Sequence, residues 1–448
     1  MATSGPVTLR RQPWLIALSI LLLGAVIAAA LAPALLPGDE HVRQIAAGVI
    51  FVGSYLALAI GRIPGLQIDR AGIALVGAGL MVASGALPLV DAYKAIDLDT
   101  VTLLLGMMIV VANLRLSGFF ALANRWVAAY AGRPVILLGA IVVTSGVLSA
   151  FLVNDAICLV LAPMVLELTL ALGRRPVPYL LAVAMASNVG SVATITGNPQ
   201  NIMIGSFSHI PYGTFALTLG PVAVVGLLVT AVLIVLGHRA EFVGDARIAV
   251  PRKRVNVNRV LLIRALSGTL IMIGLFFAGV VPAKVAIVVG GLLLLTRRLK
   301  SRRVYTEIDW SLLLMFAGLF IIVAGAQHTL LSPGIIGGTG GMGELHIDRV
   351  PVLALVTAVL SNLVSNVPAV LMLKPFIEGM KDTDTAWLVV AMASTLAGNF
   401  TVLGSVANLI VVQRAAAAGV TLGFWDYFRV GAPLTLVTLA IGTLWLSL

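Results

Sequence analysis

Residues 148–155 read Leu-Ser-Ala-Phe-Leu-Val-Asn-Asp, and residues 360–367 read Leu-Ser-Asn-Leu-Val-Ser-Asn-Val. The second stretch repeats the first at an offset of 212 residues. Further along, a second pair of segments repeats at an offset of 207 residues, with the identical pairs Thr194 and Thr401, Gly197 and Gly404, and Asn201 and Asn408. All four segments set polar residues in the middle of apolar sequence. Such duplicated interruptions are typical of the binding sites of secondary transporters, so the chain is predicted to move a small solute across a membrane.

The composition of the 448 residues agrees with a membrane protein, since 60% are hydrophobic and only 10% are charged. Several apolar runs reach the ~20 residues that a spanning helix requires, which predicts an all-α polytopic membrane protein. The net charge of +11 comes from short basic clusters between apolar runs. The positive-inside rule accounts for these clusters, so nucleic acid is not an expected partner. The single cysteine excludes a disulfide framework and a cysteine-cluster metal site.

The distribution of charge predicts the topology. The N-terminus, with Arg10 and Arg11, is placed in the cytoplasm, and a first span at 14–36 is expected to be a retained helix and not a cleaved signal. The later basic clusters fall on the same side only if residues 134–172 and 351–380 each dip into the membrane and leave on the side that they entered. The first re-entrant hairpin enters from the cytoplasm and the second from outside, which predicts two repeats of inverted topology.

The predicted domains follow from these hairpins. Residues 1–95 form N-terminal scaffold helices, and residues 238–307 form basic cytoplasmic loops and linking helices. Repeat 1 covers 96–237 and contains a helix that is broken in its middle, at 178–210. Repeat 2 covers 308–448 and contains the corresponding broken helix at 386–412.

The middle of each broken helix combines glycine with hydroxyl and amide residues. The first break, at 190–201, includes Pro199, whereas the second lacks a proline and is expected to be the weaker interruption. Backbone that leaves its helix at membrane depth is tolerated only where it lines a cavity or is buried in protein, so both breaks are predicted to form the site. Together with the hairpin tips, the predicted substrate- and ion-binding residues are Ser149, Asn154, Asp155, Gly190, Thr194, Thr196, Gly197, Asn198, Asn201, Ser361, Ser365, Asn366, Thr401, Gly404, Ser405 and Asn408.

Asp155 is the only carboxylate at either hairpin tip, because Val367 stands at the matching position. A carboxylate at membrane depth is costly and is usually tied to ions or protons, so Asp155 is predicted to carry the coupled proton. Alternatives remain open. Asp155 could instead cap the second arm of its hairpin as a permanent anion, and Ser149 and Ser361 could serve helix packing.

Four motifs carry a resemblance to a known family: Phe151-Leu-Val-Asn-Asp155, Thr196-Gly-Asn-Pro-Gln-Asn201, Val364-Ser-Asn-Val-Pro368 and Gly404-Ser-Val-Ala-Asn408. In this order and spacing they resemble the ion transporter superfamily, and within it the arsenite/antimonite permease branch and related anion permeases. The resemblance covers the chain from about residue 70 onward. It implies about eleven transmembrane helices, two re-entrant hairpins, scaffold and transport subdomains, a homodimer and an elevator-type motion.

The chain departs from the dicarboxylate/sodium symporters of that superfamily at the hairpin tips. Those symporters carry Ser-Asn-Thr at both tips, where this chain has Val153-Asn-Asp155 and Ser365-Asn-Val367. An aspartate repels a dianion and a valine offers it no hydrogen bond, so dicarboxylates are disfavoured. Arsenious acid, a small and largely uncharged trihydroxide, suits hydroxyl and amide groups beside one carboxylate.

Three functions therefore stand as hypotheses. The first is proton-coupled efflux of arsenite or antimonite across the plasma (inner) membrane, with no cofactor and no enzymatic activity. The second is a sodium- or proton-coupled transporter of inorganic or organic anions. The third is a channel, or the membrane subunit of a pump whose ATPase is a separate chain, since no nucleotide-binding motif occurs here.

Overall fold

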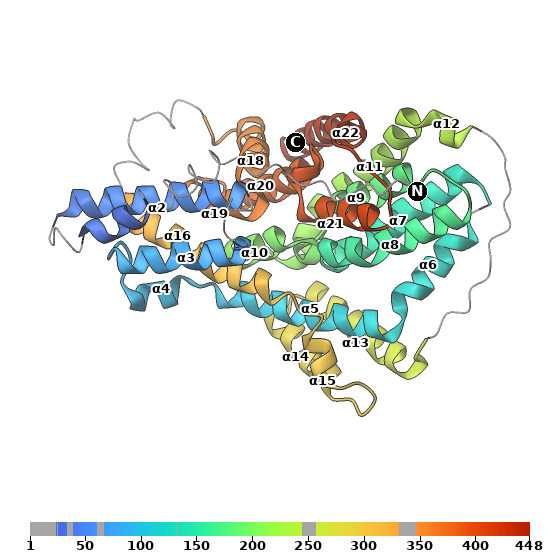
Figure 1. Cartoon of the computed structure of the whole chain (residues 1–448), viewed down its shortest axis with the longest axis horizontal. Helices are drawn as coiled ribbons and strands as arrows, with labels where there is room; N and C mark the ends of the chain where they lie inside the picture. Colours follow the sequence, from blue (N-terminus) through green and yellow to red (C-terminus); the bar gives the residue numbers. More distant parts are fainter. Residues whose placement is uncertain are drawn as a thin grey trace, which may run out of the picture. The chain divides into compact units, whose positions relative to one another are not determined.

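The computed structural model describes residues 24, 26–33, 39–60, 67–130, 132–243, 257–330 and 346–448. Among these residues all regular secondary structure is helical, which confirms the predicted all-α fold (Figure 1). Arg10, Arg11 and most of the predicted first span lie outside the described residues.

Eight helices in the described part of the chain are long and apolar enough to cross a membrane, judged by length and composition. Their bounds are Glu40–Ala59, Leu98–Ser117, Pro134–Phe151, Asn154–Ala171, Tyr212–Gly237, Arg259–Phe277, Trp310–Thr329 and Phe424–Leu446. Shorter apolar helices accompany them, so the polytopic character predicted from composition is confirmed.

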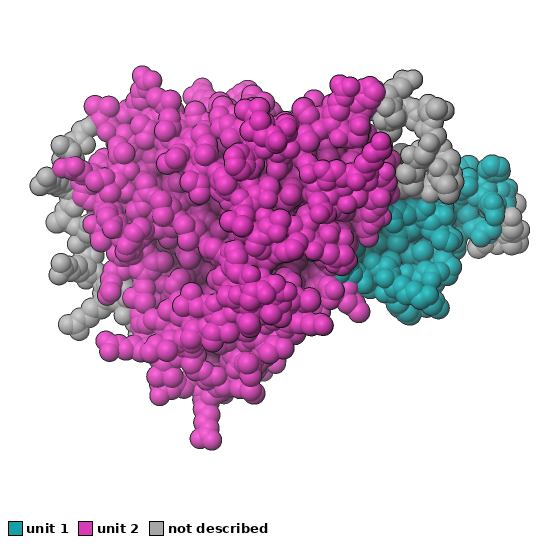
Figure 2. All heavy atoms as spheres, turned by 180° about the vertical axis from the view of Figure 1, so that it is seen from behind, with its two compact units in different colours: residues 1–97, 310–338 teal, residues 98–309, 339–448 magenta. Residues whose placement is uncertain are grey.

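The chain divides into two compact units (Figure 2). Unit 1 comprises Met1–Asp97 and Trp310–Gly338. Its helices are α2 (Glu40–Ile60), α3 (Arg70–Ala83), α4 (Leu89–Ala95) and α16 (Trp310–Leu330). Within this unit α16 packs against α2, α3 and α4, and Asp69 caps α3 by accepting a hydrogen bond from the Gly72 N–H at 2.8 Å.

Unit 2 comprises Leu98–Asp309 and Thr339–Leu448 and contains every residue of the predicted site. Its first segment holds α5 (Leu98–Ser117), α6 (Phe119–Ala129), α7 (Pro134–Phe151), α8 (Asn154–Ala171), α9 (Pro176–Ser191), α10 (Pro199–Ser208), α11 (Tyr212–Gly237), α12 (Arg239–Phe242), α13 (Arg259–Phe277), α14 (Pro282–Leu294) and α15 (Ser301–Tyr305). Its second segment holds α18 (Val350–Val364), α19 (Asn366–Ile377), α20 (Thr383–Ala397), α21 (Val406–Ala417) and α22 (Phe424–Leu446).

Two helical hairpins occur in this unit, α7 with α8 and α18 with α19. Proline at the first turn starts α7 and α18, where its missing N–H leaves no helical hydrogen bond unmade. Leu152 and Val153 connect the first pair of helices, whereas Ser365 alone connects the second pair. Each second arm carries an internal proline at a matching position, Pro163 in α8 and Pro375 in α19.

The two breaks have the same backbone design. After α9 the chain extends at Thr194 (φ −142°, ψ 163°), makes a 3-10 turn over Ile195–Gly197 and enters α10. After α20 it extends at Thr401 (φ −135°, ψ 166°), makes a 3-10 turn over Val402–Gly404 and enters α21. The expectation that the second break is the weaker one is therefore wrong. A proline is not needed there, because the Ser405 side chain caps α21 by accepting from the Ala407 N–H at 3.2 Å.

Candidate functional site

An asparagine holds each break in place. The Asn201 amide donates to the carbonyl oxygens of Ser191 and Thr194, both at 3.1 Å. The Asn408 amide donates to the carbonyls of Gly398 at 2.7 Å and Thr401 at 3.1 Å, which are the matching positions 207 residues on. Both side chains thus satisfy carbonyls that the interrupted helix would otherwise leave buried and unpaired.

The glycine of each turn lies against the helix that precedes it. A Cβ on Gly197 would sit 2.1 Å from the Ser191 carbonyl oxygen, and a Cβ on Gly404 would sit 2.8 Å from the Gly398 carbonyl oxygen. Only glycine permits so close an approach of two backbone segments. The repeated glycines therefore shape the backbone of each break.

Each repeat reaches into the break of the other. From α9, the Asn188 amide donates to Asn408 Oδ1 at 3.0 Å, and Asn188 Oδ1 accepts from Ser405 Oγ at 3.1 Å. From α20, Thr395 Oγ1 accepts from Asn198 Nδ2 at 3.0 Å and donates to Asn201 Oδ1 at 3.4 Å. Asn188 and Thr395 are also 207 residues apart, so the two sets of bonds are related by the same internal symmetry as the breaks.

The tip of the first hairpin is hydrogen-bonded to α9. Asn154 Nδ2 donates to Asn188 Oδ1 at 3.0 Å, and the Ser149 and Ser187 hydroxyls lie 2.7 Å apart. Ser187 Oγ also donates to the Asn154 carbonyl at 3.2 Å. The structure thus brings the predicted residues Ser149 and Asn154 together at the first break.

The tip of the second hairpin meets both repeats. In the amide orientation that satisfies its neighbours, Asn366 donates to the carbonyls of Ser394 at 3.2 Å and Gly404 at 3.3 Å and accepts from Gln200 Nε2 at 3.2 Å. Ser361, the counterpart of Ser149, is buried, and its hydroxyl has no partner among the described residues. Ser365 has φ 80° and ψ 158°, a conformation that is almost confined to glycine.

Asp155 is half-buried in the first turn of α8, and its own N–H donates to Asn154 Oδ1 at 3.0 Å. Its carboxyl group interacts with the backbone N–H of Ala407, in the first turn of α21, and Asp309 is a like charge in its surroundings. Helix α21 packs beside α8 (Figure 1). The carboxyl group therefore lies near the N-terminal ends of two helices, where the peptide dipoles favour a negative charge.

The remaining predicted residues have local roles. Thr194 Oγ1 donates to the Ala150 carbonyl, and the Thr196 hydroxyl lies 2.8 Å from the Tyr212 hydroxyl. Gly190 is still within α9, where it packs directly on the backbone of Gly146 in α7. Apart from the Asp155 carboxyl group, the groups gathered around the breaks are hydroxyls, amides and carbonyls. Among the residues that the structure describes, no group of three or more His, Cys, Asp or Glu could hold a metal.

Sequence reasoning missed Asn188 and Thr395, which bond between the repeats, and Ser187, which bonds to the first hairpin. Gln200 and Asn399 lie within the two breaks but were not among the predicted binding residues. Asn399 is bonded to Asn188 at 2.9 Å, and Gln200 is bonded to Thr395 at 3.2 Å. The polar character of 187–188 and 394–395 within apolar helices was the signal that could have identified part of this set.

The sequence matches a family model described as "Citrate transporter" over residues 55–397. An uncharacterized transporter of Mycobacterium bovis is 30% identical over 429 residues, which cover 90% of this chain and 98% of the relative. The silicon efflux transporter of Oryza sativa subsp. japonica is 29% identical over 471 residues, with 89% and 97% covered. The arsenical pump membrane protein of Escherichia coli is 25% identical over 440 residues, with 90% and 99% covered.

Among solved structures, the fold is similar to that of the Alcanivorax borkumensis YdaH transporter, which has an unusual topology. The TM-score is 0.57 at 16% sequence identity, and the match covers 89% of this chain and 97% of that chain.

Proposed function

This chain belongs to the citrate transporter family. We propose that it exports small, uncharged metalloid hydroxides, with arsenite and antimonite first, in exchange for protons. Membership confirms the resemblance to the ion transporter superfamily that the four motifs carried. The chain is thus a multi-pass membrane transporter and not an enzyme.

The observation that carries the substrate class is the chemistry of the bonds at the two breaks. Apart from Asp155, whose carboxyl group interacts with the Ala407 N–H, the side chains that bond across them are uncharged hydroxyls and amides, as in the contacts of Asn188 with Ser405 and Asn408. A neutral trihydroxide both donates and accepts hydrogen bonds, so it can exchange places with such groups without leaving a charge unpaired. An oxyanion would require a compensating cation, which these groups do not supply.

Asp155 is the proposed proton carrier. It is the acidic residue at the hairpin tips, it lies beside the first turn of α21, and Val367 replaces it in the second repeat. Protonation would remove its charge before the site moves through the apolar part of the membrane, which lowers the cost of that movement.

The connections among the helices support an elevator-type movement. Asn154 ties the first hairpin to α9, Asn188 ties α9 to the second break, and Asn366 ties the second hairpin to Gln200 of α10. The second arms also pack across the repeats, α8 against α21 and α19 against α10. Two hairpins and two broken helices bonded in this way are expected to move as one body, and the symmetry of their bonds supports re-entrant hairpins in repeats of inverted topology.

Two alternatives rest on specific observations. Silicic acid is also an uncharged hydroxide, and the rice relative is a silicon efflux transporter. Sodium- or proton-coupled transport of an anion is favoured by the family description and by the N-terminal ends of α8 and α21, which lie together at Asp155.

The test is uptake into everted membrane vesicles that carry the protein, with an imposed pH gradient, with and without sodium. Arsenite, silicic acid and citrate are offered in parallel arms. Accumulation of arsenite that depends on the pH gradient supports the proposal. Accumulation of silicic acid alone or of citrate alone transfers the assignment to the corresponding alternative, and a dependence on sodium replaces the proton as the coupling ion.

A further inference from the structure

A dense basic cluster follows the apolar helix α14. Five of the seven residues from 297 to 303 are basic, and all five are exposed: Arg297, Arg298, Lys300, Arg302 and Arg303. We refer to these five residues as the α15 basic surface, because α15 (Ser301–Tyr305) forms its centre.

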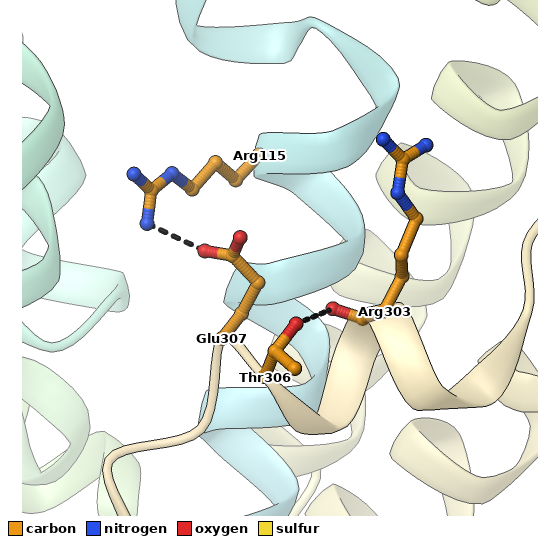
Figure 3. A network of polar contacts seen from close by, with 4 residues as sticks. All are labelled: Arg115, Arg303, Thr306 and Glu307. Atoms are coloured by element: carbon orange, nitrogen blue, oxygen red, sulfur yellow. Dashed lines mark hydrogen bonds and ion pairs between the residues drawn. The ribbon is translucent and has the colours of Figure 1, made fainter.

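The charge of this surface is not neutralised by its acidic neighbour. Glu307 lies four residues beyond Arg303, but its carboxylate is paired with Arg115 of α5, with Nη1 and Oε2 2.5 Å apart (Figure 3). In Figure 3 the Arg303 guanidinium group lies apart from this pair. Within the described part of the chain, the ion pairs leave the five basic side chains of the surface unpaired.

The surface is held in a fixed position by its surroundings. Val304 of α15 is only 1% exposed, and Thr306 Oγ1 donates to the Arg303 carbonyl at 2.9 Å. The pair between Glu307 and Arg115 attaches the end of α15 to α5. A cluster that is already ordered loses less conformational entropy when it binds a ligand.

The surface also lies where apolar helices end. Helix α14 packs beside α5 and α13, both of which are candidate spans. Arg264 of α13 donates from Nη2 to the Leu295 carbonyl at 2.7 Å and so caps the C-terminal end of α14, which directly precedes the cluster. Tyr305 is 45% exposed on the same segment, and tyrosine is enriched at the headgroup level of membranes.

We propose that the α15 basic surface binds the phosphate groups of anionic phospholipids and thereby anchors the α5–α13–α14 end of unit 2 at the bilayer surface. Basic clusters next to a spanning helix attract anionic headgroups, and arginine pairs with phosphate through two parallel hydrogen bonds. The positive-inside rule by itself requires only that basic residues lie on the cytoplasmic side of the membrane, with no particular arrangement. The fixed, unneutralised cluster next to an exposed tyrosine adds a recognition site for the headgroup itself.

The experiment titrates the purified full chain, in a neutral detergent, with phosphatidylglycerol or phosphatidylcholine and follows the midpoint of thermal unfolding. The test variant is Arg297→Gln/Arg298→Gln/Arg302→Gln/Arg303→Gln. The matched control removes four exposed basic residues elsewhere, Lys284→Gln/Arg349→Gln/Lys381→Gln/Arg414→Gln. Because each basic residue near the surface changes the affinity by about fivefold, the test variant should need at least about tenfold more phosphatidylglycerol for the same stabilisation.

Stabilisation by phosphatidylglycerol that is lost in the test variant and kept in the control supports the proposal. Equal stabilisation of both variants, or equal stabilisation by phosphatidylcholine, overturns it. Stabilisation by soluble polyglutamate without any by phosphatidylglycerol overturns it in favour of an acidic protein partner. If the test variant does not fold, the unaltered protein decides the matter, since its stabilisation by phosphatidylglycerol must fall as the salt concentration rises.

Discussion

The two repeats of unit 2 share one backbone design but differ in how deeply the break is buried and in how fully the nearby polar groups are hydrogen-bonded. We call the first the closed repeat and the second the open repeat. Around the first break every residue from 194 to 201 is buried, and the hydroxyls of Ser149 and Ser187 satisfy one another. Around the second break, Leu403 is 72% exposed and Val406 is 39% exposed. There the Ser361 hydroxyl is buried without a partner among the described residues, and Ser365 is held in a strained conformation.

Features that both repeats share are required by the fold, whereas features found in only one repeat are candidates for a role in transport. The bonds of Asn201 and Asn408 and the close approach of Gly197 and Gly404 occur in both repeats, so they belong to the fold. Of the two hairpin tips, only the first carries a carboxylate, that of Asp155, and only the second has a residue with positive φ, Ser365. Under the proposed function, the first repeat supplies the proton-binding residue, and the strained tip of the second hairpin is the part expected to change conformation when solute binds.

The largest expected effect tests the carboxylate that distinguishes the repeats. Asp155→Asn keeps the size and hydrogen-bonding capacity of the side chain but removes its titration, so proton-driven flux in everted vesicles should fall by about a hundredfold or more. Asp155→Glu is the matched control and should retain measurable flux. Unchanged gradient-driven flux in Asp155→Asn would assign Asp155 to capping α8 and not to proton transfer.

The next effect concerns the two turn glycines. Gly197→Ala places a Cβ 2.1 Å from the Ser191 carbonyl oxygen, and Gly404→Ala places one 2.8 Å from the Gly398 carbonyl oxygen. We expect the free energy of unfolding, measured in detergent micelles, to fall by about 3 kcal/mol for the first variant and by about 1 kcal/mol for the second. An equal loss in both variants would mean that the second break is packed as tightly as the first.

The reciprocal bonds between the repeats come third. Asn188→Ala removes a hydrogen-bond partner from each of the buried amides of Asn154, Asn399 and Asn408. The free energy of unfolding should therefore fall by about 2 kcal/mol. Thr395→Ala, the matching change in the other repeat, removes one hydroxyl and should cost about 1 kcal/mol. The double variant measures whether the two sets of bonds are energetically coupled. If the two losses in free energy of unfolding simply add, the two sets of bonds are independent, which would contradict a single moving body.

The sequence predicted the places where the repeats are identical. Thr194, Gly197 and Asn201 recur as Thr401, Gly404 and Asn408 because the same backbone geometry requires the same side chains in both halves. Matching positions that differ were predicted less completely: Asn198 and Ser405 were included, whereas Asn188 and Thr395 were missed.

Asn188 and Thr395 are not identical, and they act on the other repeat, so their partners depend on tertiary packing that no local pattern reveals. The second break was expected to be weak because it lacks a proline. Ser405 and Asn408 achieve the same geometry by hydrogen bonding. A helix break can thus be made by side-chain hydrogen bonds as well as by proline. Of the two, only proline is easily recognised in the sequence.

The smallest expected effect has the opposite sign and tests the strain in the open repeat. Ser365 has φ 80° and ψ 158°, whereas Val153, at the matching tip, has φ −49° and ψ 122°. Ser365→Gly should therefore stabilise the protein by about 0.5–1 kcal/mol, because glycine adopts that conformation without a steric penalty. Val153→Gly should destabilise it by about 2 kcal/mol or more, since it removes a side chain that is only 5% exposed and also adds freedom to the unfolded chain. If Ser365→Gly raises the unfolding midpoint but slows transport, the strain belongs to the working cycle of the second hairpin; if the midpoint falls, the Ser365 side chain contributes more to stability than its backbone conformation costs.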